Sequence, residues 1–329
     1  MPLSRSVCLL SAVCCLLVSG CAAPQYAVRS LPVPDESAWV RGLEQTISAY
    51  QARELQREGV RPVWRGERLF GFDLQQTVDR LSRVTERPTL AYRVFLLYDK
   101  APNAVALADG RIYLTTGMLN YLASRGGPVK SRSDFQDLVP DPPAFLRKQE
   151  GGSRGRESEL ATIVGHELAH TVAQHLVKRY QQLQKQQLLM TVVGLGAAVA
   201  ARGAGADAQQ MGQDAQDIAG LISDVAATGY SQEQELEADQ LGVRYCLRAG
   251  YDPRAALELL QDFARFDTPS PFLRTHPPTE RRLEDLERYL TSLDEDRRRL
   301  LDAQKLYPVG SQSWKNLQRQ LEELEGHRR

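Results

Sequence analysis

Two histidines and a glutamate lie within one five-residue stretch, His166-Glu167-Leu168-Ala169-His170. Residues four apart lie on one face of an α-helix, so His166 and His170 can direct two ring nitrogens at one metal ion. Glu167 would lie beside a water molecule activated by that metal, where it can take a proton and pass it to a leaving amine. The stretch therefore predicts zinc-dependent hydrolysis of peptide bonds.

The residues around this stretch have the periodicity of a buried helix. Apolar side chains recur at helical spacing from 160 to 176, and acidic residues near the start predict a helix that begins close to Arg156. Between His170 and Gln181 no proline or glycine intervenes, so a single helix is expected. On such a helix His175 lies half a rotation from His166. It should point away from the metal and have a structural or partner-facing role.

A third metal ligand is predicted on a second helix. Ser231, followed by Gln234, has the spacing of a capping box, and Glu235 and Asp239 then share one helix face. Glu235 can bind the metal while Asp239 hydrogen-bonds a ligand histidine and fixes its tautomer. Gly242 continues this face and would let two helices approach closely. Acidic residues four apart also mark solvated helix faces, so the inference depends on the histidine pair.

Alternating apolar residues predict a small β-structure between Tyr92 and Leu119. Val94, Leu96 and Tyr98 alternate, and Asp109-Gly110 is a hairpin signal. We expect a small antiparallel hairpin or sheet in a mainly α-helical chain, which is an α+β fold.

Four segments between about Val94 and Leu286 resemble the zinc peptidase family that includes the CAAX prenyl protease, HtpX, the mitochondrial Oma protease, BepA and LoiP. These segments are 103–106 with 110–117, 165–170, 230–239 and 275–282. The resemblance implies a gluzincin-type metallopeptidase domain with one Zn²⁺ per chain, bound by His166, His170 and Glu235. It also implies Glu167 as the catalytic base and Asp239 as an outer-sphere or proton-donating acid.

The resemblance extends to three further features. His276 would be a removable fourth ligand or an oxyanion stabiliser, the alternative being a histidine that only opens the next helix. Arg282 would bind a substrate carbonyl or pair with an acid of the site helix. A strand at the sheet edge would pair with an extended substrate, or would simply pack on the metal helix. Its residues are Asn103, Ala104, Val105 and Ala106.

The first residues resemble a bacterial lipoprotein signal. Arg5 precedes an apolar stretch, and Leu17-Val18-Ser19-Gly20-Cys21 is a lipobox, which predicts a signal peptide over 1–20 and lipid on Cys21. A plain signal peptide or a short membrane anchor is the alternative. Ala22 favours the outer membrane, so we expect the chain at its periplasmic face. Cys246 would be the remaining free thiol, buried and inert.

The remaining organisation follows from composition. We expect an N-terminal helical segment over 21–90, the metallopeptidase domain over 91–290 and charged helices over 291–329. Within the domain, 126–156 reads as a loop or lid and 188–220 as an apolar, Ala- and Gly-rich insertion. The apolar run 188–201 is too short to span a bilayer and should pack over the cleft or touch the membrane surface. A formal net charge of zero disfavours nucleic-acid binding.

These features together predict a lipid-anchored envelope zinc metalloendopeptidase. By resemblance its substrates would be misfolded or misassembled envelope proteins, with an assembly-machinery partner not identified by the sequence. One alternative is an aminopeptidase with the same zinc ligands. Another is a non-proteolytic or self-inhibited chaperone or assembly factor that retains the zinc site, against which Glu167 argues, because a structural site does not use a base.

Overall fold

The computed structural model describes residues 29–56, 59–124, 152–194, 216–223, 225, 229–265 and 270–325. Its helices are α1 (Ala38–Leu55), α2 (Leu74–Ser82), α3 (Thr116–Ser124), α4 (Gly152–Val172), α5 (His175–Gly194), α7 (Gln232–Arg248), α8 (Ala255–Phe263), α9 (Pro271–Thr275), α10 (Glu280–Gln304) and α11 (Gln312–Glu325). Its strands are β1 (Val60–Pro62), β2 (Arg68–Leu69), β3 (Phe72–Asp73), β4 (Arg93–Leu97), β5 (Ala104–Ala106) and β6 (Arg111–Thr115). The predicted lipobox with Cys21, and most of 126–156 and 188–220, lie outside the described residues.

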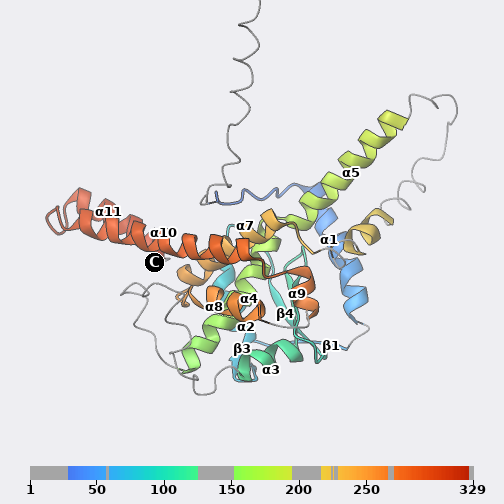
Figure 1. Ribbon diagram of the computed structural model, residues 1–329, viewed down its shortest axis with the longest axis horizontal. Coiled ribbons are helices and arrows are strands. Elements are labelled where there is room, and N and C mark those ends of the chain that lie inside the picture. Colours follow the sequence, from blue (N-terminus) through green and yellow to red (C-terminus); the bar gives the residue numbers. More distant parts are fainter. Residues whose placement is uncertain are drawn as a thin grey trace, which may run out of the picture.

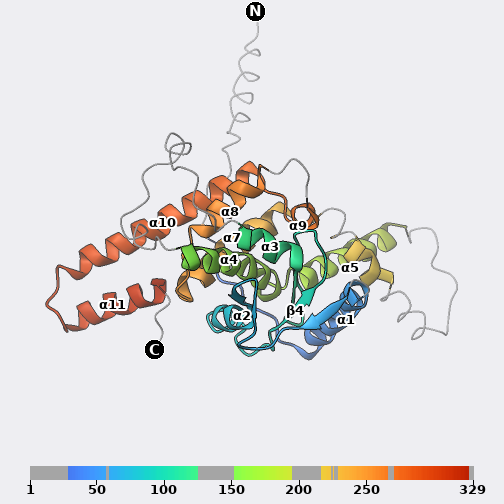
Figure 2. The same cartoon turned by 90° about the horizontal axis from the view of Figure 1, so that it is seen from below.

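The elements form a helical body with a small sheet on one side (Figure 1). Helix α5 extends away from this body, and α10 with α11 forms a hairpin that extends in another direction (Figure 2). The prediction of a mainly helical α+β fold is confirmed. Among the described residues, no helix combines the length and the apolar character needed to cross a membrane.

The four-stranded sheet has the order β1-β4-β6-β5. β5 and β6 form the antiparallel hairpin predicted at Asp109-Gly110, with Val105 opposite Tyr113. β4, however, pairs with β6 in parallel, so the sheet is mixed and not purely antiparallel. The reason is that the chain after β4 passes beyond β6 and places β5 at the outer edge, a choice that strand periodicity does not contain.

Helices α4 and α7 form the centre of the body, and they approach closely where both carry glycine. A Cβ placed on Gly242 would lie 2.9 Å from the backbone nitrogen of His166, and one on Gly165 would lie 3.1 Å from the Gly242 carbonyl oxygen. The predicted role of Gly242 in close helix approach is therefore confirmed. Cys246, one turn further along α7, is free and buried, and burial raises the pKa of its thiol to about 12.

The metal-motif helix is shorter than its periodicity predicts. Instead of one helix, α4 ends at Val172 and α5 begins at His175, with Gln174 in the left-handed region at φ 56°. Contacts with the N-terminal segment stabilise this break, because the Gln174 amide accepts a hydrogen bond from Asp35 N and donates one to Glu44 Oε1, at 2.8 Å each. The single-helix prediction is wrong because these partners are remote in sequence.

A buried ion pair fixes α1 against the end of α4. Arg87 donates to both carboxylate oxygens of Glu44, at 2.7 and 2.9 Å, and both side chains are almost fully buried. Arg87 also donates to Glu36 at 2.7 Å and to the carbonyl oxygen of Thr171 at 3.4 Å. One arginine therefore joins the N-terminal helix to the helix that carries the paired histidines.

Candidate metal centre

Helix α4 presents His166 and His170 on one face, as their spacing requires. Both side chains are buried, and their Nε2 atoms lie 3.1 Å apart. Because both Nε2 atoms face the same small volume, the two rings can offer a lone pair each to one cation placed there.

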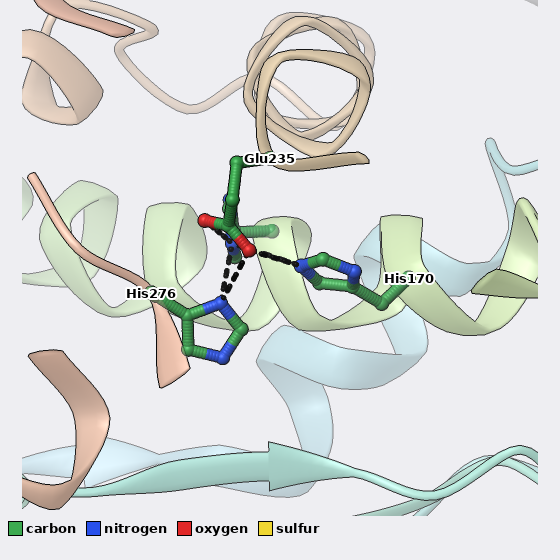
Figure 3. Close-up of side chains that lie close together, drawn as sticks. His170, Glu235 and His276 are labelled. Carbon is green, nitrogen blue, oxygen red and sulfur yellow. Dashed lines mark hydrogen bonds and ion pairs between the residues drawn. The ribbon is translucent and has the colours of Figure 1, made fainter. Parts of the chain in front are cut away.

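Glu235 reaches the same point from the first turn of α7. The helix begins with a capping box, in which Ser231 Oγ accepts from Gln234 N and the Gln234 side chain accepts from Ser231 N. Glu235 Oε2 lies 3.4 Å from His166 Nε2, and its Oε1 lies 3.4 Å from His170 Nε2. Figure 3 shows this carboxylate between the imidazoles of His170 and His276.

His276 is the fourth member of the cluster. It caps the C-terminus of the short helix α9, and its Nδ1 lies 2.9 Å from Glu235 Oε1 and 3.2 Å from His166 Nε2. The neighbouring turn is held by Tyr230 N, which donates to the carbonyl oxygen of Thr275 at 3.2 Å. The donor atoms of the four side chains all lie within 4.8 Å of one another.

The spacing of the His166, His170 and Glu235 donors is close to that around a tetrahedral metal ion. Zinc–nitrogen and zinc–oxygen bonds of about 2.0–2.1 Å give tetrahedron edges of about 3.3 Å. The five contacts just described measure 2.9–3.4 Å, with both Glu235 oxygens taking part, and the full set of four donors spans up to 4.8 Å. Three imidazoles and one carboxylate are also a donor set that zinc accepts.

The electrostatics of the site also favour a cation. Glu167, Glu235 and Asp239 are all buried, and among the described residues the one arginine that pairs with this group is Arg282. Burial opposes protonation of His166, but the nearby carboxylates outweigh it and raise the pKa of His166 to about 9. Burial lowers the pKa of His170 well below its usual value, which leaves this imidazole neutral.

Asp239 and Arg282 support the cluster from behind. Asp239 Oδ1 lies 3.0 Å from His166 Nδ1, which can donate when Nε2 faces the cluster. Arg282 donates to both oxygens of Asp239 at 2.8 Å, and its Nη1 lies 2.8 Å from Glu235 Oε2 and 2.9 Å from the Pro277 carbonyl oxygen. Asp239 therefore contacts the side of His166 that faces away from the cluster, and Arg282 pairs with two acids of α7.

Glu167 lies between the cluster and the edge strand. Its Oε2 accepts a hydrogen bond from Ala106 N at 2.9 Å. Its Oε1 is buried 3.3 Å from His276 Nε2 and, within the described part of the chain, has no hydrogen-bond partner. Burial raises the pKa of Glu167, which brings this carboxylate closer to the range useful for a general base at neutral pH.

β5 occupies the sheet edge next to α4, where the sequence places an expected substrate-binding strand. Its inner edge is used by β6: Thr115 N donates to Asn103 O at 3.1 Å and Leu107 N donates to Arg111 O at 2.7 Å. Ala106 N, on the other edge, points to Glu167. The edge strand therefore leads to the Glu167 carboxylate, and its residues are Asn103, Ala104, Val105 and Ala106.

Three residues near the cluster were not assigned to it from the sequence. Tyr230 stacks on His170, with ring centroids 3.8 Å apart. His175 Nδ1 lies 2.7 Å from His170 Nδ1, and His175 Nε2 lies 3.2 Å from Glu237 Oε2. The expectation that His175 points away from the face of the histidine pair is wrong, because it assumed an unbroken helix, although His175 is not one of the four residues of the cluster. Tyr230 and Glu237 lie within a quoted motif segment, which was the available signal.

Comparison with known proteins identifies the family. The family model described as Peptidase family M48 matches residues 72–290, which include every residue of the cluster. The beta-barrel assembly-enhancing protease of Escherichia coli K12 is 33% identical over 138 residues, covering 39% of this chain and 26% of that protein. The match therefore spans about a quarter of the bacterial relative.

Mitochondrial relatives match over longer stretches at lower identity. The mitochondrial metalloendopeptidase OMA1 of Arabidopsis thaliana is 23% identical over 199 residues, covering 59% of this chain and 30% of that protein. The Saccharomyces cerevisiae protein of the same name is 21% identical over 308 residues, covering 85% of this chain and 74% of that protein. With the family match covering two thirds of its length, the chain belongs to Peptidase family M48.

Proposed function

We propose that this chain is a zinc-dependent endopeptidase whose metal is held by His166, His170 and Glu235, with Glu167 as its base. The observation that carries the proposal is the set of distances of 3.1–3.4 Å between the donors of these three residues, which are close to tetrahedron edges, beside a buried glutamate with a raised pKa. A metal site with a purely structural role does not require such a base.

The residues of the chain divide the work of peptide hydrolysis. Zinc in this site would polarise the scissile carbonyl and make a water molecule nucleophilic near neutral pH. Glu167 would serve as the base that takes a proton from this water and as the acid that gives it to the leaving amine. Ala106 N fixes the Glu167 carboxylate at 2.9 Å, and the edge strand from Asn103 to Ala106 holds an extended substrate beside it.

His276 makes the resting site self-inhibited in this proposal. His276 Nδ1 lies 2.9 Å from Glu235 Oε1, so His276 would act as a fourth ligand at rest and would exclude water and substrate from that position. Hydrolysis then requires the His276 side chain to leave. The same observation supports the second candidate, a non-proteolytic chaperone or assembly factor in which His276 never leaves.

Zinc content and casein cleavage separate these functions. We expect one zinc per chain in wild type, Glu167→Gln and His276→Ala, cleavage reduced about 10²–10⁴-fold in Glu167→Gln, and cleavage increased in His276→Ala. Glu157→Gln is the matched control, because it makes the same change about 15 Å away along α4 and should cleave like wild type. Zinc bound in every variant with no cleavage in any would support the non-proteolytic function.

The location and substrates belong to the same proposal. The lipobox ending at Cys21 supports lipid anchoring, and Ala22 supports the periplasmic face of the outer membrane. A bacterial relative is named for enhancing β-barrel assembly, which supports misassembled envelope proteins as substrates. Labelling with radioactive palmitate in bacterial cells tests the anchor: wild type should incorporate label and Cys21→Ser should not. Equal labelling of the two would reject it.

A further inference from the structure

The two histidines of α4 are oriented by different groups. His166 Nδ1 meets the carboxylate of Asp239 directly at 3.0 Å. His170 Nδ1 meets another histidine, because His175 Nδ1 lies 2.7 Å away. Since His170 Nε2 faces the cluster, the support of this ring depends on what His175 can accept or donate.

Only one arrangement of protons suits the contacts of His170. To present a lone pair at Nε2, neutral His170 carries its proton on Nδ1 and donates it to His175 Nδ1. His175 must then carry its own proton on Nε2, which lies 3.2 Å from Glu237 Oε2. The Glu237 carboxylate accepts a hydrogen bond from His175 Nε2–H. Each residue therefore donates to the next one, from His170 to His175 to Glu237.

We propose that His175 and Glu237 are positioning residues that fix the tautomer and ring orientation of His170 and thereby strengthen metal binding. The proposal rests on the proposed function, because it takes His170 as a metal ligand. It assigns a role to the second glutamate of Glu235-Leu236-Glu237-Ala238-Asp239, whose first and last acids already contact the cluster.

The backbone places His175 for this contact. On an unbroken helix His175 would lie about half a rotation from His166. The left-handed conformation of Gln174, at φ 56°, ends α4 and starts α5, and it turns the His175 side chain back to His170. His175 is only 1% exposed, and its carbonyl oxygen accepts a hydrogen bond from the Gln234 side chain at 3.3 Å.

Helix α7 supplies both the cluster carboxylate and the end of the chain. Glu235 and Glu237 are two residues apart, so they leave the helix on different sides, one towards the cluster and one towards His175. A displacement of α7 would therefore move the direct donor and the outer support of His170 together. Tyr230, stacked on His170 with ring centroids 3.8 Å apart, restricts the same ring from its face.

Zinc affinity of the metal-stripped full chain, measured by competition with a chromogenic chelator, tests the proposal. Loss of an outer-sphere partner typically weakens metal binding by about 10–100-fold, and we expect a loss in this range for His175→Leu. His175→Asn can place an amide oxygen near the position of Nδ1, so it should recover part of the lost affinity. Glu237→Gln should lie between wild type and His175→Leu, and Glu233→Gln, an exposed change on the same helix, should match wild type.

Two further readouts separate positioning from loss of fold. Cobalt-substituted His175→Leu should show an altered visible absorption spectrum, whereas that of Glu233→Gln should be unchanged. If His175→Leu does not fold, Glu237→Gln still decides the question, because the Glu237 side chain is partly exposed. If both His175→Asn and Glu237→Gln bind zinc as tightly as wild type, the inference is overturned. The proposed function still stands in that case, provided that wild type binds one zinc per chain. Failure of wild type to bind zinc would overturn both.

Discussion

Gly242→Ala tests whether the close approach of α4 and α7 is needed to assemble the site. The added Cβ would lie 2.9 Å from His166 N and 3.1 Å from the carbonyl carbon of Gly165. Both are backbone atoms, so no flexible side chain can move aside. Ordinary van der Waals contact begins at 3.4 Å, and the helices must therefore separate by about 0.5 Å.

This separation should cost both stability and metal affinity. Overpacking of a tight interior typically costs about 1–3 kcal/mol, and each kcal/mol lowers the melting temperature of a domain of this size by about 2–4 °C. Glu235 is carried on the displaced helix, while His166 and His170 stay on α4. Metal–ligand distances tolerate only about 0.2 Å, so zinc binding should weaken as well.

Thermal unfolding of the metal-free chain and zinc competition measure the two effects. Gly42→Ala is the matched control, because a Cβ at Gly42 in α1 meets nothing within 4 Å and should stabilise the chain by about 0.4–1 kcal/mol. If Gly242→Ala and Gly42→Ala have the same melting temperature and the same zinc affinity, backbone contact between α4 and α7 does not set the geometry of the site.

Three other perturbations follow from the buried charges. Arg282→Met should lower the unfolding free energy of the metal-free chain by about 3–5 kcal/mol, because it leaves Glu235 and Asp239 without their cation. Added zinc should then raise the unfolding free energy of this variant more than that of wild type. Equal increases in denaturant titrations would contradict this. Arg87→Met should also lower the unfolding free energy by about 3–5 kcal/mol, because it breaks the buried pair with Glu44. Arg288→Ala removes an exposed pair and should lower it by less than about 1 kcal/mol. Similar losses in the two variants would refute the argument that the buried pair matters more. His166 has a raised pKa of about 9, so its protonation stabilises the metal-free chain fully below about pH 6.5, and this stability is lost as the pH rises through 9. A His166→Gln variant should lose this pH dependence of the unfolding free energy. An unchanged pH profile would contradict the raised pKa of His166.

The His170 side chain and the helix break at Gln174 are connected to the N-terminal segment. Gln174 takes its left-handed conformation in contact with Asp35 and Glu44, and Glu44 is held by Arg87. The same break brings His175 to His170. Residues far from the motif in sequence therefore support the orientation of one of its histidines.

Local features of the sequence were sufficient for most of the donor set. His166, His170 and Glu235 are predictable because helical spacing and a capping box are properties of neighbouring residues, and the structure brings these side chains together. The role of Gly242 was likewise predictable, since a missing side chain permits close approach wherever two helices cross. His276 was suggested by family resemblance and not by spacing.

Tertiary structure alone decided the features that depend on remote partners. The parallel pairing of β4 with β6 follows from where β5 is placed, and strand alternation is the same for either direction. The end of α4 at Val172 depends on hydrogen bonds from residues more than a hundred positions away, so helix propensity predicted continuation and the wrong direction for His175. Local periodicity therefore determined which residues share a helix face, whereas packing between distant segments determined where the helix stops and which side chains contact His170.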